Sequence, residues 1–438
     1  MRPWGLAAVL LLALASLARA KPAAEPVVAI TGATVYPSPT AAPIPNGVVL
    51  LQGAKVLAVG TAQEVAVPPG ATLIDGKGLG VAAGFWNFHV HFTGPEWQDA
   101  ATAPAAALAK AMEAMLNRYG FTTVVDAGSN PSNTFALRAR VQHGDVPGPR
   151  ILTAGSPLYP KGGIPIYLRQ SLPPDVLAQL AQPATAAEAR ADVTANLAAG
   201  ADATKVFSGS WLGGGKTLEM APDILRAAVE ASHQAKKPVL THPQTLEGVR
   251  RALAAGVDVL MHTTPDAGPW PEELVSALVR AHLGLVPTLS LWQVVGHEAM
   301  GDPLKVEAFV QGGVSQLRAF AKAGGQVLFG TDVGFHRQTD TSEELARMAQ
   351  AGLSWRATLA SLTTAPASRF PGSGTGTLAK GEPADVVLFQ GEPLRDPRAY
   401  SRIVLTFRGG KVLYRAPEPV FTPARPVTPA VTPWPKTK

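Results

Sequence analysis

Residues 84–92 read GFWNFHVHF, an apolar segment with two histidines placed two positions apart. A run this rich in aromatic residues, bounded by glycine, is typical of a buried strand. Because alternate residues of a strand face the same way, His89 and His91 are expected to project to one face and could chelate one metal ion. A chain with nine histidines contains an H-x-H pair by chance fairly often. Other features of the sequence are therefore needed to judge whether this pair binds metal.

Seven further apolar segments follow the first one. The eight segments are GFWNFHVHF (84–92), FTTVVDAG (121–128), PRILTAG (149–155), ADATKVF (201–207), PVLTH (238–242), VDVLMHT (257–263), LGLVPTLS (283–290) and GQVLFGTD (325–332). The runs between them, such as 105–119, 222–235 and 342–351, carry apolar residues at helical spacing. Strand–helix alternation implies right-handed crossovers and a parallel sheet, and eight units predict an α/β fold, a (β/α)8 TIM-like barrel. An open doubly wound sheet is the alternative.

The two ends of the chain have a different pattern. Residues 27–37, 47–60 and 64–78 are short extended segments broken by Gly and Pro, and residues 384–391 and 403–415 form a similar pair with a turn at Gly409-Gly410. We therefore expect both ends to build one small β-sandwich domain. The predicted division is 21–80 for its N-terminal part, 81–370 for the barrel, 371–415 for its C-terminal part and 416–438 for a proline-rich tail.

The first twenty residues have the composition of an export signal. A basic start is followed by an apolar run at 6–17 and by Ala18-Arg19-Ala20, the small-x-small pattern of a cleavage site. The apolar run is shorter than the roughly 20 residues that a bilayer-spanning helix needs, so we expect no stable membrane insertion. The chain has no cysteine and so no disulfide. These features predict an exported protein, periplasmic or secreted, with a retained anchor as the alternative.

Charge argues against a nucleic-acid partner. The net charge is +6, but lysines and arginines are scattered and do not form a basic stripe interleaved with aromatic residues. A small-molecule substrate is the expected partner, and the sequence does not decide the oligomeric state.

Further candidate ligands stand at the same place in other strand–helix units. Lys205 lies near the end of the fourth strand, His242 ends the fifth, His262 ends the sixth and Asp332 ends the eighth. Taken singly, each has an ordinary explanation, such as a lysine at the barrel rim or an aspartate capping a helix. All strand C-termini of a barrel open onto one face, so five of the eight ends deliver these side chains to a common mouth. Imidazole and carboxylate suit zinc and also manganese, iron or nickel.

These segments resemble the amidohydrolase superfamily, in particular its imidazolonepropionase-like and prolidase-like branch. The resemblance rests on GFWNFHVHF, GFTTVVDAG, ADATKVF and FGTD, and on TTAPASRF (363–370) and GTGTLAKGEPADVVLF (374–389) after the barrel. It implies two divalent metal ions, expected to be Zn²⁺. The metal ligands it implies are His89, His91, Lys205, His242, His262 and Asp332. Lys205, carboxylated, would bridge the two ions.

The same resemblance implies hydrolysis of a carbon–nitrogen bond by a metal-bound hydroxide, with Asp332 as the catalytic general acid and base. Three positions depart from common forms of the family. Asn87 stands where Asp is frequent, Pro243 follows His242, and residues 261–264 read MHTT instead of containing Glu-His-Gly. None of these changes removes a ligand, but they bear on the choice of substrate.

Substrate choice is expected to lie in the loops beyond the strand ends. Tyr167 and Arg169 in the third loop and His336 in the eighth are the first candidates, because such groups can hold a substrate carboxylate. The leading hypothesis is amide hydrolysis of an N-acyl amino acid, a dipeptide or a cyclic amide. The alternatives are lactone, ester or phosphotriester hydrolysis at the same site, and an exported binding protein without catalysis.

Overall fold

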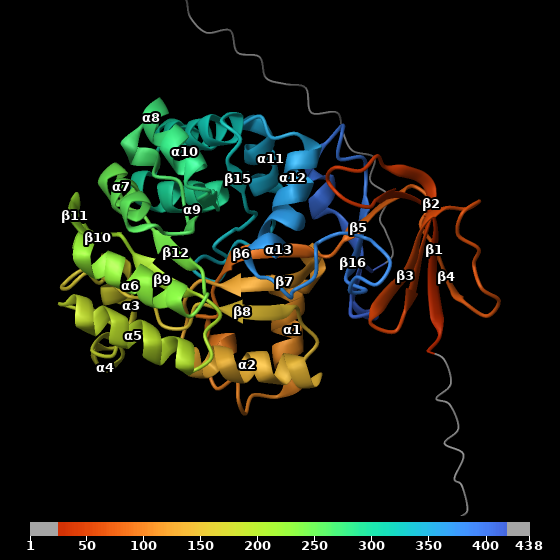
Figure 1. Ribbon diagram of the computed structural model, residues 1–438, viewed down its shortest axis with the longest axis horizontal. Helices are drawn as coiled ribbons and strands as arrows, with labels where there is room; N and C mark the ends of the chain where they lie inside the picture. The colour runs from red at the N-terminus through yellow and green to blue at the C-terminus, as the bar shows by residue number, and fades with distance from the viewer. Residues whose placement is uncertain (1–24, 418–438) are drawn as a thin grey trace, which may run out of the picture.

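The computed structural model describes residues 25–417 and has two parts, a barrel and a small β-domain beside it (Figure 1). The expected signal peptide, 1–20, lies outside the described residues, as does the expected tail except for Ala416 and Pro417.

All eight predicted barrel strands are present. They are β6 (Phe85–Val90), β7 (Phe121–Asp126), β8 (Arg150–Thr153), β9 (Thr204–Phe207), β12 (Val239–His242), β13 (Val259–Leu260), β14 (Gly284–Leu285) and β15 (Gln326–Val327). Their ladders are parallel and run in the orders β6-β7-β8 and β9-β12-β13-β14-β15. The predicted strand–helix alternation is therefore correct.

Backbone hydrogen bonds join the two ladders at both seams. At the first seam, Leu158 N donates to Lys205 O at 2.9 Å and Phe207 N donates to Leu158 O at 2.9 Å. At the second, Phe88 N donates to Phe329 O at 2.7 Å and Asp332 N donates to His89 O at 2.8 Å. The sheet is thus closed into a (β/α)8 TIM-like barrel, and the open sheet is excluded.

Helices cover the outside of the barrel (Figure 1). The α-helices are α1 (Ala105–Met115), α2 (Pro131–His143), α3 (Ile166–Ser171), α4 (Pro174–Leu177), α5 (Ala186–Ala198), α6 (Pro222–Gln234), α7 (Leu246–Ala255), α8 (Glu272–Arg280), α9 (Leu289–Met300), α10 (Pro303–Lys322), α11 (Ser342–Gln350), α12 (Trp355–Leu362) and α13 (Thr364–Arg369). A hairpin of β10 (Gly209–Gly213) and β11 (Lys216–Glu219) extends beyond β9. Long loops therefore lie at the C-terminal ends of the strands, where a barrel carries its site.

Inside the barrel, an apolar cluster takes residues that lie on, or directly next to, each of the eight strands. It includes Phe88, Val125, Ala154, Ala203, Leu240, Val259, Val286 and Leu328. Lys205 continues the inward face of β9 two residues beyond Ala203, and His242 does the same beyond Leu240. The barrel interior is thus apolar along most of its length and polar at the C-terminal ends of the strands.

The small domain combines strands from both ends of the chain. Its strands are β1 (Val27–Tyr36), β2 (Ile44–Gln52), β3 (Lys55–Thr61), β4 (Thr72–Asp75), β5 (Leu79–Ala83), β16 (Val386–Gln390), β17 (Ile403–Arg408) and β18 (Lys411–Arg415). They form one sheet in the order β18-β17-β16-β5-β1-β2-β3, with β4 beside β1. The sheet curls around an apolar core to which β2, β3, β16 and β17 all contribute. The edge strand β3 also contacts the segment before β16, where Val56 N donates to Glu382 O at 2.9 Å.

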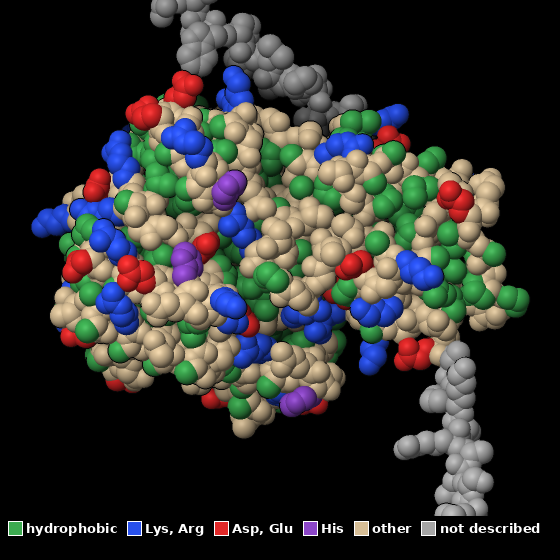
Figure 2. Space-filling model, in the orientation of Figure 1, with side chains coloured by type: hydrophobic (Ala, Val, Ile, Leu, Met, Phe, Trp, Pro, Cys, Tyr) green, Lys and Arg blue, Asp and Glu red, His purple; other side chains and the backbone are tan. Residues whose placement is uncertain are grey.

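The surface carries charges of both signs. On the face drawn in Figure 2, lysines and arginines alternate with acidic side chains and leave no continuous basic stripe. Among residues 25–417, no helix combines the length and apolar character that crossing a membrane requires.

Candidate active site

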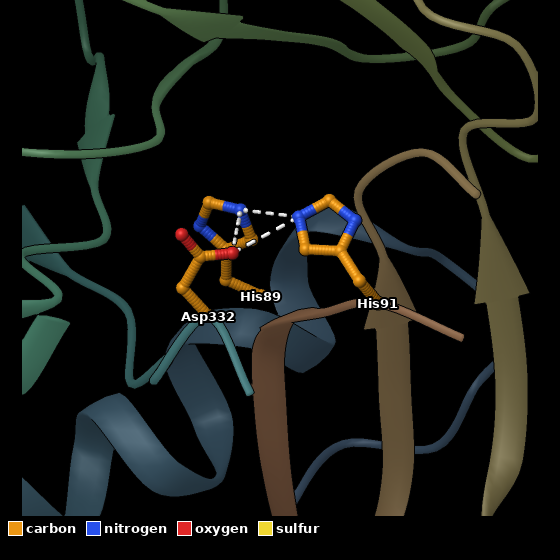
Figure 3. Close-up of side chains that lie close together, drawn as sticks. All are labelled: His89, His91 and Asp332. Atoms are coloured by element: carbon orange, nitrogen blue, oxygen red, sulfur yellow. Dashed lines mark hydrogen bonds and ion pairs between the residues drawn. The ribbon is translucent and has the colours of Figure 1, made fainter. Parts of the chain in front are cut away.

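Three predicted ligands meet at the C-terminal end of the barrel. The Nε2 atom of His89 lies 3.2 Å, and that of His91 3.0 Å, from Oδ1 of Asp332, and the two Nε2 atoms are 3.3 Å apart (Figure 3). Each residue offers a ligand atom, and these atoms all lie within 4.8 Å of one another. His89 and Asp332 are buried and His91 is nearly so. This is a compact arrangement that can hold one metal ion.

The close approach of the first and eighth strands depends on backbone geometry. Asp332 adopts a left-handed conformation with φ +61°, which turns the chain sharply after Thr331. Gly334, with φ +100°, passes directly against the backbone of His91, where any Cβ atom would collide with the His91 carbonyl group. The sequence FGTDVG thus places the Asp332 carboxylate beside the two histidines.

His262 and His242 extend the cluster into a row of imidazoles. The ring centroid of His262 is 4.7 Å from that of His89 and 4.7 Å from that of His242. The Nε2 atom of His262 lies 4.0 Å from Oδ2 of Asp332. His262 therefore lies near the other oxygen of the Asp332 carboxylate, and His242 packs against His262.

Lys205 lies beside this row with its side chain almost completely buried. Its Nζ atom is 5.4 Å from the centroid of the Phe207 ring, which in turn stacks on His242 at 4.7 Å. Its charge is close enough to lower the pKa values of His89, His242 and His262. All six predicted ligands thus converge on one end of the barrel.

Hydrogen bonds to backbone and side-chain oxygens fix the orientation of three imidazoles. Nδ1 of His91 lies 2.6 Å from Gly128 O, Nδ1 of His262 lies 2.7 Å from Thr288 Oγ1, and Nε2 of His242 lies 3.2 Å from Gln244 Oε1. A carbonyl or amide oxygen can only accept, so His91 and His242 each donate from that nitrogen. In the neutral form of each ring the opposite nitrogen carries a lone pair, as a metal ligand requires.

Burial keeps most of these groups in the neutral form. Desolvation, followed by the charge of Lys205, lowers the pKa of His242 to about 4 and that of His89 well below its usual value. Desolvation also lowers the pKa of Lys205 to about 8, although Asp332 and Asp126 oppose the shift. His91 differs: burial lowers its pKa, but the carboxylates of Asp332 and Asp126 outweigh that effect and raise it. Neutral imidazoles are the form that binds metal.

The donor set fits a metal centre. Oδ1 of Asp332 and Nδ1 of His89 are buried with no hydrogen-bond partner among the described residues. Unpaired buried polar atoms are costly, and a cation held between Oδ1 of Asp332 and the two Nε2 atoms would pair with this carboxylate oxygen. Histidine nitrogens with carboxylate oxygens are typical zinc ligands, and an open coordination position leaves room for substrate.

Comparison with known protein families gives the same answer as the geometry. The sequence matches the amidohydrolase family over residues 81–413, which covers the whole barrel and the return into the small domain. The chain belongs to the amidohydrolase family. It is therefore a hydrolase that acts on carbon–nitrogen bonds of small molecules, and the family is metal-dependent. No curated protein sequence matched this amidohydrolase.

Solved structures support the assignment. A candidate prolidase from Bifidobacterium longum is 28% identical, with 90% of this chain and 95% of that chain covered and a TM-score of 0.74. A Xaa-Pro dipeptidase with bound methionine is 21% identical over 89% of this chain and all of that chain, with a TM-score of 0.76. Phenylurea hydrolase B is 23% identical over 93% of this chain and all of that chain, with a TM-score of 0.73. The last two likenesses concern the fold alone.

The amidohydrolase uses Asn87 to join the first and eighth strands. Its Oδ1 accepts from the backbone amides of His89 at 3.1 Å and Thr331 at 3.2 Å, and its Nδ2 donates to Thr331 Oγ1 at 2.8 Å. The departure from Asp at this position therefore keeps the acceptor for both amides. The departures in MHTT also have partners, since Thr263 Oγ1 accepts from Trp292 Nε1 at 2.8 Å and Thr264 Oγ1 accepts from Trp270 Nε1 at 2.9 Å.

Sequence reasoning missed Asp126, a buried carboxylate at the end of β7. It accepts hydrogen bonds from Thr153 at 2.6 Å and from Ser129, and it helps to raise the pKa of His91. Burial raises the pKa of Asp126 itself. The signal was present, because Asp126 ends its strand just as Asp332 ends the eighth.

The three proposed substrate residues have different surroundings. The Tyr167 ring packs edge-on against Phe335 at 5.1 Å, and burial, with the charges of Tyr159 and Asp332, raises the pKa of Tyr167 well above its usual value. His336 is buried, and its Nε2 lies 2.8 Å from Thr331 O while its Nδ1 has no hydrogen-bond partner among the described residues. Arg169 is exposed and donates to Leu212 O at 2.9 Å, which ties α3 to β10.

Proposed function

We propose that this amidohydrolase cleaves the amide bond of an N-acyl amino acid, a dipeptide or a cyclic amide. The observation that carries the proposal is the convergence of His89, His91 and Asp332 with a buried lysine and a second pair of histidines. A binding protein without catalysis would have no need to keep every ligand of a two-metal site.

Two divalent ions, proposed to be zinc, would be held by the six predicted ligands. His89, His91 and Asp332 would bind one ion, and His242 and His262 the other. Bound there, the ions would act as Lewis acids and lower the pKa of water to about 7.

Lys205 is proposed to be carboxylated and to join the two halves of the site. An ammonium group cannot bind a cation, whereas addition of the neutral amine to CO₂ gives a carbamate anion and releases one proton. Burial lowers the pKa of Lys205 to about 8, which increases the fraction of neutral amine at physiological pH. Carboxylation also replaces a buried positive charge with a negative one where four imidazoles gather.

Asp332 is proposed as the general acid and base. Its carboxylate lies at the centre of the cluster, so it can take the proton of the attacking water and deliver it to the departing nitrogen. Proton transfer of this kind typically contributes 10²–10⁴-fold to the rate.

Tyr167, His336 and Arg169 are proposed to contact substrate. The raised pKa of Tyr167 keeps its hydroxyl protonated at neutral pH, so it can donate to a substrate oxygen. Because Nε2 of His336 donates to Thr331 O, its unpaired Nδ1 can accept from a substrate N–H group. Arg169 gives one donor to Leu212 O and keeps others for a substrate carboxylate.

A hydrolysis screen paired with elemental analysis tests the proposal. Purified protein, dialysed against chelator and reloaded with Zn²⁺, is assayed on matched amides, lactones and phosphotriesters. We expect about two zinc ions per chain and cleavage of at least one amide faster than its matched lactone and phosphotriester.

The matched variants are Lys205→Ala and Lys110→Ala, the latter at an exposed position on α1. Lys205→Ala should lose both activity and bound zinc, and Lys110→Ala should keep both. Short-chain acids such as acetate can replace a missing carbamate, so partial rescue of Lys205→Ala by added acid would support the carboxylated form. Full zinc occupancy with no amide cleaved, or faster cleavage of the lactones or phosphotriesters, would refute amide hydrolysis.

Export is proposed from residues 1–20 alone. Expression with this segment in a Gram-negative host should give a protein that begins at Lys21, as read by N-terminal sequencing of the periplasmic fraction. A purified protein that still begins at Met1 would show that residues 1–20 are not cleaved and would contradict the proposed signal peptide.

A further inference from the structure

Helix α9 begins beside the metal cluster, but the residue that precedes it does not cap it. Thr288 stands at the N-cap position and makes no side-chain hydrogen bond to the helix. Its Oγ1 instead donates to Pro287 O at 2.9 Å and lies 2.7 Å from Nδ1 of His262. Because a hydroxyl has one proton, this donation leaves an Oγ1 lone pair to accept from Nδ1–H of His262.

Glu344 on helix α11 supplies the missing cap. Its Oε2 accepts from the backbone amide of Ser290 at 2.7 Å. Glu344 is completely buried, although acidic residues rarely are. A carboxylate at a helix N-terminus satisfies free amides and interacts favourably with the helix dipole.

The first turn of α9 holds His262 from two sides. Thr288 binds Nδ1, and the Trp292 ring packs edge-on against the imidazole at 5.5 Å. Trp292 Nε1 also donates to Thr263 Oγ1 at 2.8 Å. Thr288 itself has φ +47°, a left-handed conformation that costs energy for a β-branched residue and persists only where neighbours impose it.

We propose that Glu344 is a positioning residue for His262. By capping α9 in place of Thr288, it frees the Thr288 hydroxyl to accept a hydrogen bond from Nδ1 of the histidine. The imidazole is then held with its Nε2 lone pair directed toward Asp332, from which Nε2 lies 4.0 Å away. This inference rests on the proposed metal centre, because it assigns Nε2 of His262 as a ligand.

The consequence concerns metal affinity more than folding. Groups that orient a metal-binding histidine typically contribute 10- to 100-fold to metal affinity. Removal of the Glu344 side chain should release the first turn of α9, return the Thr288 hydroxyl to the helix and let the imidazole rotate. Glutamine at the same position keeps a carbonyl oxygen for the Ser290 amide and should preserve the arrangement.

Three variants separate positioning from general stability. Glu344→Ala removes the cap, Glu344→Gln keeps an acceptor, and Thr288→Val removes the hydroxyl while keeping a β-branched shape. Thr185→Ala is the matched control, since Thr185 caps α5, and its loss should lower thermal stability without reaching the site. Each protein is titrated with Co²⁺, and binding is measured by the visible absorption of the bound ion. In parallel, ¹⁵N-histidine-labelled samples treated with chelator are examined by NMR to observe the hydrogen-bonded imidazole N–H.

We expect Glu344→Ala and Thr288→Val to weaken binding of one Co²⁺ ion by 10- to 100-fold and to lose one imidazole N–H resonance. Glu344→Gln and Thr185→Ala should keep both. Unchanged Co²⁺ affinity and an unchanged resonance in Glu344→Ala would overturn the inference, even if the variant is less stable. A wild-type protein that binds no Co²⁺ would overturn both the proposed function and the ligand role of His262. If wild type binds Co²⁺ normally, the metal centre stands and the variants test the positioning role of Glu344 alone.

Discussion

The Nε2 atoms of His89 and His91 lie 3.3 Å apart at the end of β6. Because His91 donates from Nδ1 to Gly128 O, its Nε2 directs a lone pair toward the ring of His89. Two nitrogens this close together beside the Asp332 carboxylate need a proton or a cation between them. A metal ion held between these three groups would therefore stabilise the folded barrel as well as serve catalysis.

Metal removal should lower thermal stability. A ligand that binds only the folded state at 100 times its Kd stabilises that state by about 2.7 kcal/mol, so chelation should lower Tm by several degrees. Calorimetry with and without chelator measures the shift. In His91→Asn the chelator effect should be much smaller, whereas the exposed control His297→Asn should behave as wild type. Equal melting temperatures with and without chelator would contradict a structural contribution from metal.

Asn87 should tolerate Asp but not Ala. Asn87→Ala leaves the buried amides of His89 and Thr331 without an acceptor, and each unpaired group costs about 1–3 kcal/mol. Asp keeps both acceptors, and the Thr331 hydroxyl can turn to donate to it. Urea unfolding of the zinc-loaded proteins should give a free energy of unfolding at least about 2 kcal/mol lower for Asn87→Ala than for Asn87→Asp. Equal values would show that these two hydrogen bonds contribute little.

The barrel and the places of the candidate ligands could be predicted from the sequence because both depend on local sequence patterns. Each strand is a short apolar run, and each ligand stands at or near the end of its run, as His242 does in PVLTH. Parallel strands then bring those ends together without any further information. The small domain was predicted from its hairpins. No local pattern, however, reveals that β5 pairs with both β1 and β16 and so joins the two ends of the chain in one sheet.

The supporting residues could not be predicted in the same way. Glu344 looks like an ordinary helix residue beside Glu343, and only packing of α11 against α9 buries it at the Ser290 amide. Thr288 lies in LGLVPTLS, where its left-handed conformation leaves no mark on the sequence. Such roles arise from contacts between separate elements, 54 residues apart for Ser290 and Glu344 and 26 for His262 and Thr288, so strand and helix patterns do not reveal them.

Gly334 should not accept a side chain. Alanine there would have to adopt φ +100° and place its Cβ against the His91 carbonyl, which would push the eighth strand end away from β6. Gly324→Ala is the control, because Gly324 has φ +85° with open space around the new Cβ atom. The control should cost about 1–2 kcal/mol of unfolding free energy from backbone conformation alone.

Gly334→Ala should cost clearly more than Gly324→Ala and should also lose zinc, as read by urea unfolding and elemental analysis. Similar losses of stability in the two variants, with zinc retained in both, would mean that the backbone at residue 334 has room to move.

Glu344 should make stability depend on pH. Burial raises the pKa of Glu344 from 4.5 to about 7, so the folded state holds this proton more tightly than the unfolded state does. The stability that this provides is fully present below about pH 4.5 and is lost as the pH rises to about 7. The shift corresponds to at most about 3 kcal/mol. Glu344→Gln cannot titrate, so wild type should lose stability relative to this variant across that interval.

The comparison uses urea unfolding of wild type and Glu344→Gln at several pH values from 4.5 to 8, with chelator present so that metal binding does not contribute. Other titrating groups are common to both proteins and cancel in the difference. Glu113→Gln, at an exposed position on α1, controls for the loss of one carboxylate. The difference in unfolding free energy between wild type and Glu344→Gln could instead stay constant with pH. That result would mean that Glu344 keeps its charge when buried, because the amides of α9 stabilise the carboxylate enough to offset its burial.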